Sequence, residues 1–202
     1  MVLPLSGEPP GSTVEFTANL RAELPGLLRK LNVHRLLDAP CGDYNWFRLV
    51  ERPSQVRYIG GDVVQTLIER NRSVFSKDNV DFISLDITQD ELPDADLWLC
   101  RDCLAHFSYN DIYRALVNFL RSNITYLLTS THPCNDRNRT IVTGDFQMLN
   151  LQRPPFDFSL PLRLIDDWVD ENETRQLGLW QRQALAADLA DNKAFQKVAD
   201  QH

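Results

Sequence analysis

Residues 34–44 read HRLLDAPCGDY, an apolar segment that ends in an acid and continues into a turn with one glycine. A short apolar run bounded by turn formers is typical of a buried β-strand, so we predict a strand over about 34–39. Asp38 lies at the end of this strand and Gly42 lies in the turn. The segment therefore predicts a carboxylate at the end of an inner strand.

Two more predicted strands end in the same way. The strand at 56–61 is followed by Asp62, and the strand at 80–85 is followed by Asp86. If the three strands are neighbours in a parallel sheet, their carboxylates meet at one edge, which is a costly arrangement of like charges. A ligand rich in hydrogen-bond donors, and preferably cationic, would relieve that repulsion.

Strands and helices alternate through the middle of the chain. The further elements that we predict are helices over about 64–73 and 109–121 and strands over about 95–100 and 124–130. This alternation implies right-handed βαβ units and an α/β fold with a mainly parallel sheet. In such folds a ligand binds beyond the carboxyl ends of the strands.

The N-terminal part of the chain predicts one more helix. Ser12-Thr-Val-Glu15 has the form of a capping box and precedes a series of leucines, so we expect a helix over about 13–31, interrupted near Pro25. A second capping signal, Ser108-x-x-Asp111, opens the helix at 109–121. Both signals satisfy backbone N–H groups that a helix start leaves without partners.

The chain after residue 130 follows a different pattern. Residues 132–160 contain turn formers and aromatic residues without a helical period, which favours an irregular segment that covers the substrate side. Two strands at 161–169 and 176–183, separated by a polar turn, predict an antiparallel hairpin. The polar tail over 184–202 predicts a frayed helix.

The composition of the 202 residues, with 43% hydrophobic and 24% charged, is that of a folded protein. We expect a single domain over 1–202 with its core over about 34–183. The formal net charge of −7 disfavours nucleic acid as a partner, because phosphate backbones are also negative. The sequence has neither a signal-peptide pattern nor a membrane-spanning apolar run, so we expect a cytoplasmic protein with no membrane partner.

Four segments, in the order LLDAPCGD, YIGGD, SLDI and LWLCRDCLAHF, carry a family resemblance. Over about residues 13–183 the chain resembles the class I S-adenosylmethionine-dependent methyltransferases. The resemblance implies S-adenosylmethionine as the cofactor. It also implies a Rossmann-like doubly wound sheet, mostly parallel, with strand order 3-2-1-4-5-7-6 and a C-terminal antiparallel hairpin.

The same resemblance implies a role for each cofactor-binding residue. Asp38 would orient the loop and the methionine part of the cofactor, and Asp62 would accept hydrogen bonds from both ribose hydroxyls. Asp86 would accept from the adenine amino group, beside the backbone of Ile87. Arg101 would line the methionine side. The loop packed against the cofactor would consist of Ala39, Pro40, Cys41 and Gly42.

The loop departs from the family's glycine-rich pattern at two positions. Pro40 and Tyr44 stand where glycines are common. Because tyrosine lacks the freedom of glycine, we expect Tyr44 to cover the ligand instead. The departure does not favour a nicotinamide-dependent oxidoreductase, since the chain has no G-x-G-x-x-G motif.

Three residues that follow the fourth and fifth strands are candidates for a catalytic base. Asp102 and His106 follow the fourth strand and His132 follows the fifth, so all three are expected at the mouth of the cofactor site. We favour His106 as the base, with Asp102 orienting it or the acceptor. The ordinary alternatives are helix packing for His106 and loop structure for His132.

Cys100 and Cys103 form a C-x-x-C motif close to His106, and Cys41 is expected one strand away. These residues could form a zinc site or a redox pair, or they could be small buried thiols. We favour buried thiols and expect no metal, because zinc sites of this type usually contain two such motifs.

The sequence thus predicts a methyltransferase that acts on a small-molecule or sugar-type acceptor, at oxygen. The alternative is a methyltransferase-like protein that binds the cofactor, or a partner, without catalysis, and the altered loop at Pro40 and Tyr44 motivates it. The sequence leaves the oligomeric state open.

Overall fold

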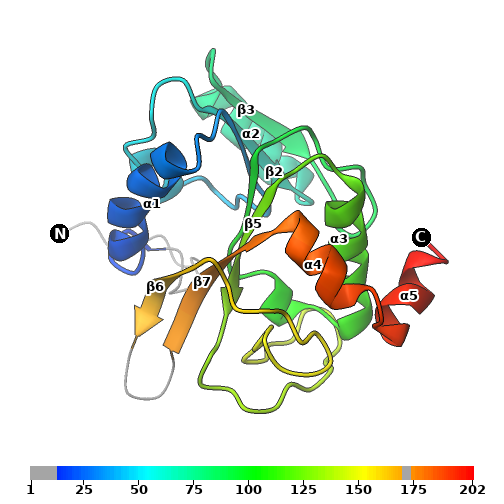
Figure 1. Cartoon of the computed structure of the whole chain (residues 1–202). Coiled ribbons are helices and arrows are strands. Elements are labelled where there is room, and N and C mark those ends of the chain that lie inside the picture. The colour runs from blue at the N-terminus through cyan, green and yellow to red at the C-terminus, as the bar shows by residue number, and fades with distance from the viewer. Residues whose placement is uncertain (1–12, 170–173) are drawn as a thin grey trace.

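The computed structural model describes residues 13–169 and 174–202. Seven strands form one sheet with helices on both of its faces (Figure 1). The strands are β1 (Arg35–Asp38), β2 (Arg57–Asp62), β3 (Val80–Ser84), β4 (Leu97–Cys100), β5 (Tyr126–Thr131), β6 (Arg163–Val169) and β7 (Thr174–Gln181). The helices are α1 (Ala18–Lys30), α2 (Gln65–Phe75), α3 (Tyr109–Arg121), α4 (Arg182–Leu189) and α5 (Lys193–Ala199).

The strand order is β3-β2-β1-β4-β5-β7-β6, as predicted. Strands β1 to β5 are parallel, and β7 runs antiparallel to both β5 and β6. The chain passes from β1 to β2 on one side of β1 and later returns to β4 on the other side of β1. The carboxyl ends of β1, β2 and β4 therefore meet at a switch point of strand order, where open α/β sheets bind ligands.

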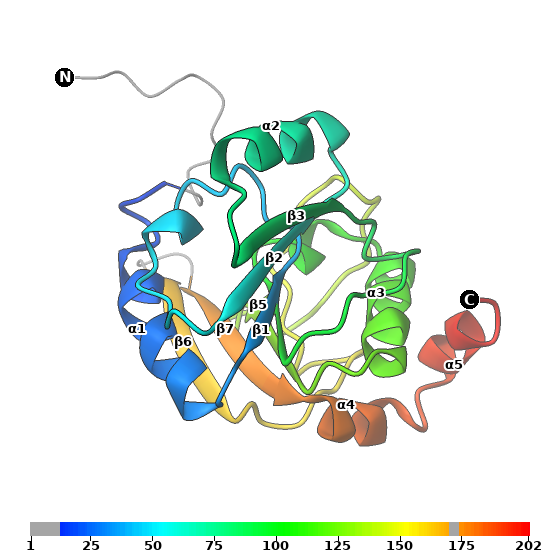
Figure 2. The ribbon, with the colours of Figure 1, turned by 90° about the horizontal axis from the view of Figure 1, so that it is seen from above.

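Two apolar cores enclose the sheet. On one face α1 and α2 cover inward-facing residues such as Leu36, Tyr58 and Leu99. On the other face α3, α4 and α5 cover Leu37 and Trp98. The view along the sheet shows these three layers (Figure 2). Because both faces are buried, the strands are nearly continuous apolar runs rather than alternating ones.

Helix α1 differs from the sequence prediction in two details. It runs through Pro25 without interruption, and that proline is buried with the leucines of the helix. The helix begins later than predicted, after Thr17, whose hydroxyl donates a hydrogen bond to the Thr13 carbonyl oxygen. Ser12 of the predicted capping box lies outside the described residues. The Ser108 cap of α3 is confirmed, since its Oγ accepts from the Asp111 N–H at 3.2 Å.

The C-terminal tail differs most from the sequence prediction. Instead of one frayed helix, it forms α4 and α5, which bury Leu185, Leu189, Phe195 and Val198 against the core beside α3. Asn192 caps α5 by accepting from two backbone N–H groups. Buried apolar residues are few in this polar sequence, but their spacing places them on one side of each helix.

The predicted hairpin and irregular segment are confirmed. Strands β6 and β7 pair antiparallel, and the turn between them lies outside the described residues. Residues 132–160 form no helix or strand, yet they bury Leu149, Leu151, Phe156 and Phe158 against the sheet's carboxyl end (Figure 1). No helix among the described residues is long and apolar enough to span a membrane.

Candidate functional site

Asp38 ends β1 in the interior of the protein. Its side chain accepts a hydrogen bond from the Tyr58 hydroxyl at 2.7 Å, and the residue is only 2% exposed. Burial raises the pKa of Asp38 to about 7, although the Tyr58 hydrogen bond and the Arg101 charge oppose the rise and the Asp62 charge adds to it. Asp38 is thus a carboxyl group close to its titration point near neutral pH.

The loop after Asp38 is anchored to its neighbours by backbone groups. The Cys41 N–H donates to the Gly61 carbonyl oxygen at 2.8 Å, and Trp98 Nε1 donates to the Ala39 carbonyl oxygen at 2.9 Å. These bonds fix the loop between β2 and β4, at the switch point.

Gly42 joins this loop to the end of β2. Its φ of +56° is a left-handed conformation that glycine adopts without strain. Its N–H donates to Asp62 Oδ2 at 3.1 Å, and its carbonyl oxygen accepts from Asn71 Nδ2 at 2.8 Å. Asn71 is fully buried on α2 and was not identified from the sequence, since nothing local distinguishes it from other polar helix residues.

Tyr44 does not cover a ligand site, contrary to the expectation from the sequence. Its φ is +61°, and its side chain is only 6% exposed. The ring packs 4.8 Å from Tyr58 and 5.1 Å from Phe82, measured between ring centroids, so it belongs to the aromatic core below the loop. The left-handed backbone turns the side chain inward, and ring contacts compensate for the strain.

Asp62 ends β2 with its carboxylate shared between two backbone donors. Oδ2 accepts from Gly42 as above, and Oδ1 accepts from the Val64 N–H at 3.0 Å. A carboxylate has about four acceptor positions, so each oxygen can accept one more hydrogen bond. The adjacent Val63 is 66% exposed and places an apolar surface next to these oxygens.

Asp86 lies two residues beyond β3 and binds its own turn. Oδ1 accepts from the N–H and the hydroxyl of Thr88, and Oδ2 accepts from Gln89 Nε2 at 2.6 Å. Burial opposes ionisation of Asp86, but the hydrogen bonds from Thr88 and Gln89 outweigh it and lower the pKa. Ile87 is buried, and its carbonyl oxygen accepts from Asn118 Nδ2. We call Asp38, Asp62 and Asp86 the acidic edge.

A second group of charges lies at the ends of β4, β6 and β7. Arg101 binds both oxygens of Asp167 through Nε and Nη2, at 2.9 to 3.1 Å, and Asp167 also accepts from Arg175 Nε at 2.8 Å. Arg175 Nη1 lies 2.9 Å from Asp102 Oδ1. The Asp167 side chain is 0% exposed. We call Arg101, Asp102, Asp167 and Arg175 the ion-pair cluster.

Two members of this cluster, Asp167 and Arg175, are not identified by the sequence. Asp167 lies at an irregularity of β6, between Asp166 and Trp168, where the register with β7 shifts. A bulge of this kind redirects a side chain, but the sequence contains no signal for it. Arg175 then meets Asp167 across the hairpin. Arg101 is held further by Trp46, whose ring centroid lies 5.3 Å from the guanidinium carbon.

The three candidate bases occupy different environments. Asp102 is half-buried and faces Arg175. His106 is half-buried, with Nδ1 3.0 Å from the carbonyl oxygen of Asp145. His132 is 0% exposed, so the expectation that it lies at the mouth of the site is wrong.

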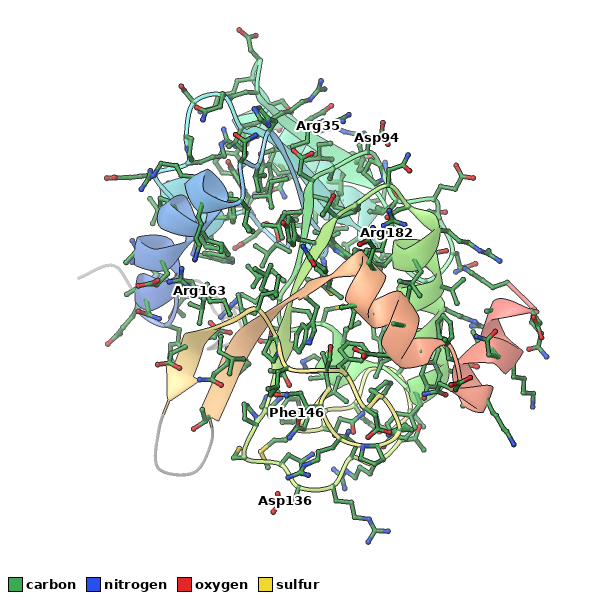
Figure 3. The ribbon with its side chains drawn as sticks, viewed as in Figure 1. Arg35, Asp94, Asp136, Phe146, Arg163 and Arg182 are labelled. Carbon is green, nitrogen blue, oxygen red and sulfur yellow. The ribbon has the colours of Figure 1, made fainter. Side chains whose placement is uncertain are left out.

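Backbone bonding decides which ring nitrogen can accept a proton. His132 Nδ1 accepts from the Leu149 N–H at 3.1 Å, which anchors the irregular segment. In His106 the carbonyl partner requires the proton on Nδ1, and Nε2 is therefore the basic nitrogen of the neutral ring. Both rings lie near Phe146, which is labelled in the irregular segment (Figure 3).

The cysteines are free thiols. Cys41, Cys100 and Cys103 are buried and Cys134 is exposed. A hydrogen bond with Cys100, together with burial, raises the pKa of the Cys103 thiol. Among the described residues, no three His, Cys, Asp or Glu side chains are arranged to hold a metal ion.

No protein-family model and no curated protein matches this chain. Solved structures do match this chain. The methyltransferase domain of bacterial CtHen1 superposes with a TM-score of 0.61 at 12% identity, over 82% of this chain and 99% of that one. This chain has the class I S-adenosylmethionine-dependent methyltransferase fold.

Two further structures with this methyltransferase fold were determined with ligands present. Human N-acetylserotonin methyltransferase in complex with S-adenosylmethionine gives a TM-score of 0.57 at 13% identity, over 82% of this chain and 52% of that one. The N-terminal domain of EvdMO1, in the presence of S-adenosylhomocysteine and D-fucose, gives 0.55 at 14% identity, over 80% of this chain and 81% of that one. The chain thus spans about half the length of the human enzyme.

The acidic edge fits the cofactor for which this methyltransferase fold is named. S-adenosylmethionine is cationic at its sulfonium and ammonium groups and offers hydroxyl and amino donors. Asp62 has free acceptor positions beside the exposed Val63, and Asp38 is a buried carboxyl group that a nearby cation would stabilise in its charged form.

Proposed function

We propose that this chain is an S-adenosylmethionine-dependent methyltransferase and that it works as a single domain over residues 1–202. The observation that carries the proposal is the acidic edge at the switch point of a methyltransferase fold. The Asp62 charge adds to the cost of ionising the buried Asp38, and a cationic ligand with several donors removes that cost.

Each residue of the acidic edge has a part in this proposal. Asp62 accepts from the two ribose hydroxyls with the positions that Gly42 and Val64 leave free. Adenine lies against the exposed Val63, and Asp86 Oδ2, which has one donor, accepts from the adenine amino group. The methionine part lies at Asp38.

The loop and the ion-pair cluster complete the proposed binding site. Arg101 lines the methionine side, and Asp167 keeps its guanidinium in place through two hydrogen-bonded atoms. The loop residues Ala39, Pro40, Cys41 and Gly42 present their backbone to the cofactor. The site supports this role because hydrogen bonds to Gly61 and Trp98 fix the loop on both sides.

We propose that the acceptor is a small molecule or a sugar, methylated at a hydroxyl oxygen. The cofactor, when bound, supplies a methyl group on a positively charged sulfur. The chain must then hold the acceptor in line, exclude water and take the hydroxyl proton. The structure of EvdMO1 in the presence of D-fucose supports a sugar as the acceptor class.

His106 is the residue that we propose for removal of this proton. Its Nε2 is the basic nitrogen, and its backbone and ring hold residues 144 and 145 of the irregular segment. His132 is a poor alternative, because its Nδ1 already accepts a hydrogen bond and its ring is buried.

One observation favours a second candidate function, that of a cofactor-binding protein without catalysis. Asp102, the residue expected to orient the histidine or the acceptor, is instead paired with Arg175. A chain that binds S-adenosylhomocysteine but methylates none of a panel of hydroxyl, amine and thiol acceptors would support this second function.

Isothermal titration with S-adenosylhomocysteine tests the cofactor. We expect binding with one molecule per chain. An absence of binding, together with binding of a nicotinamide dinucleotide, would overturn the proposal and restore the oxidoreductase alternative.

Turnover in the His106→Ala variant tests the base. We expect S-adenosylhomocysteine affinity within a few fold of the native chain, and turnover of a hydroxyl acceptor lower by at least about 10²-fold. His34→Ala, a change at an exposed histidine immediately before β1, is the control. Full turnover in His106→Ala would remove the base role and leave catalysis to alignment alone.

A further inference from the structure

A cavity lies away from the acidic edge, between α3, α5 and the irregular segment. Its volume is about 600 Å³, which is within the range of small-molecule sites. None of its described lining residues belongs to the acidic edge or to the ion-pair cluster. In Figure 1 it corresponds to the region where the start of α3, the irregular segment and α5 come together.

Hydrogen bonds and ring contacts fix the walls of this cavity. The Tyr113 hydroxyl donates to the Pro155 carbonyl oxygen at 3.1 Å, and Asn192 Nδ2 donates to the same oxygen at 2.7 Å. The ring of Tyr113 lies 6.0 Å from that of Phe195. Asn138 Nδ2 donates to the Pro154 carbonyl oxygen at 3.0 Å. Three segments distant in sequence are therefore locked together around the space.

The lining has an apolar floor and a cationic rim. Tyr109, Pro154 and Val198 contribute rings and aliphatic surface. Arg137 and Lys197 are its charged residues, and no described lining residue is acidic. Neither cation forms an ion pair with a described residue. The Asp157 charge acts on Tyr113, but Asp157 is not part of the lining. The two lining cations give the rim a positive charge, which in a chain with a net charge of −7 favours a negative ligand.

We propose that this cavity binds an organic anion with a flat apolar body, such as an aromatic carboxylate. The body lies against Tyr109, Tyr113 and the two prolines, and the carboxylate binds between Arg137 and Lys197. Aromatic and proline surfaces favour a flat ligand, and an unpaired guanidinium offers a forked pair of donors to a carboxylate. This site is separate from the cofactor site and does not rest on the proposed function.

Ligand-observed NMR with 2-naphthoate, and with the neutral 2-naphthylmethanol for comparison, tests the proposal on the full chain. We expect 2-naphthoate to bind more tightly than the alcohol. Lys197→Gln and Arg137→Gln should each weaken 2-naphthoate binding by at least about tenfold and leave the alcohol unchanged. Lys193→Gln, on the same helix but outside the lining, is the matched control and should change neither.

Two further measurements locate the bound ligand. Ala194→Trp, at an exposed position of the lining, should fill the cavity and abolish binding of both compounds while the thermal midpoint stays near the native value. Saturating S-adenosylhomocysteine should not displace 2-naphthoate. The proposal is wrong if the native chain does not bind 2-naphthoate, if the alcohol binds as tightly, if the three variants bind it normally, or if S-adenosylhomocysteine displaces it.

Discussion

The acidic edge and the ion-pair cluster lie at the same end of one sheet and hold their charges in different ways. Asp62 and Asp86 accept from backbone or side-chain donors within a few residues of themselves or of the adjoining loop. Asp167, by contrast, is held by Arg101 and Arg175 from two other strands, in full burial. The bonds of Asp86, and the bond from Val64 to Asp62, are local, whereas the bonds from Gly42 to Asp62 and from Tyr58 to Asp38 and all those of Asp167 exist only in the folded sheet.

This difference predicts which carboxylates can be substituted without a large loss of stability. At the acidic edge, the burial of Asp38 beside the Asp62 charge costs stability at neutral pH, whereas Asp167 in the cluster is paired with Arg101 and Arg175. Removing a carboxylate from the edge should change ligand affinity and pH dependence. Removing Asp167 from the cluster should destabilise the protein, because two buried cations lose their shared carboxylate.

The largest effect is expected from Asp167→Asn. The change leaves Arg101 and Arg175 without their shared carboxylate in an environment where both side chains are less than a tenth exposed. We expect the free energy of unfolding to fall by about 3–5 kcal/mol, measured by urea denaturation. Asp81→Asn, which removes an exposed pair with Arg57, should cost less than about 1 kcal/mol. Equal losses in the two variants would contradict the distinction between the regions.

The pH dependence of stability should reveal Asp38. The pKa of Asp38 is about 7 in the folded protein and near 3.8 in the unfolded chain. Between these values the folded state holds a proton that the unfolded state has released, so this residue's contribution to stability falls as the pH rises from about 4 to 7. Asp38→Asn stays neutral and can still accept from Tyr58. Its stability relative to the native chain should therefore rise over that range, by at most about 4 kcal/mol.

Asp86→Asn should show the opposite sign and serves as the comparison. The pKa of Asp86 is lowered in the folded protein, so the native chain gains from this residue at neutral pH and loses that gain as the pH falls. Urea denaturation of both variants between pH 3 and 8 measures the two slopes. Parallel slopes would show that Asp38 is ionised at neutral pH like an exposed acid.

Asp62→Ala should weaken binding of S-adenosylhomocysteine. Two ribose hydroxyls would lose their acceptor, which costs about 1–3 kcal/mol, or roughly 5- to 150-fold in the dissociation constant. Isothermal titration measures it. Asp94→Ala, at the amino end of the sheet where the acid pairs with exposed Arg35 (Figure 3), is the control and should bind normally. An unchanged constant in Asp62→Ala would remove the acidic edge from the cofactor site.

The smallest effect on stability is expected in the loop after Asp38. Gly42→Ala adds a methyl group that meets nothing within 4 Å, so its cost is that of the left-handed backbone, about 1–2 kcal/mol. Gly26→Ala, in α1 and with equally open space, should instead stabilise by about 0.5–1 kcal/mol. Comparing the thermal unfolding of the two variants measures the cost of the backbone conformation, because the added methyl group meets no neighbour in either one. Changes of the same sign would contradict this interpretation.

Much of the fold follows from the sequence, because its signals are local. Apolar runs that end in Asp38, Asp62 and Asp86 identify three strands within a residue or two of their observed bounds. The alternation of strands with helices implies the parallel sheet, and the resemblance implies its strand order. The prediction of one frayed helix for the tail is wrong. The few apolar residues of α4 and α5 are buried only when the two helices pack beside α3, and this contact is not visible in the local sequence.

The candidate site divides in the same way. The order of residues along the chain is enough to identify the acids that end the strands and the turn at Gly42, because both depend on residues close together in the chain. Three features arise only in the folded chain: the inward side chain of Tyr44, the burial of His132, and the pairing of Asp167 with both Arg101 and Arg175. Ring packing, burial and ion pairing arise between segments that the sheet brings together, and their energies depend on how much water the fold excludes.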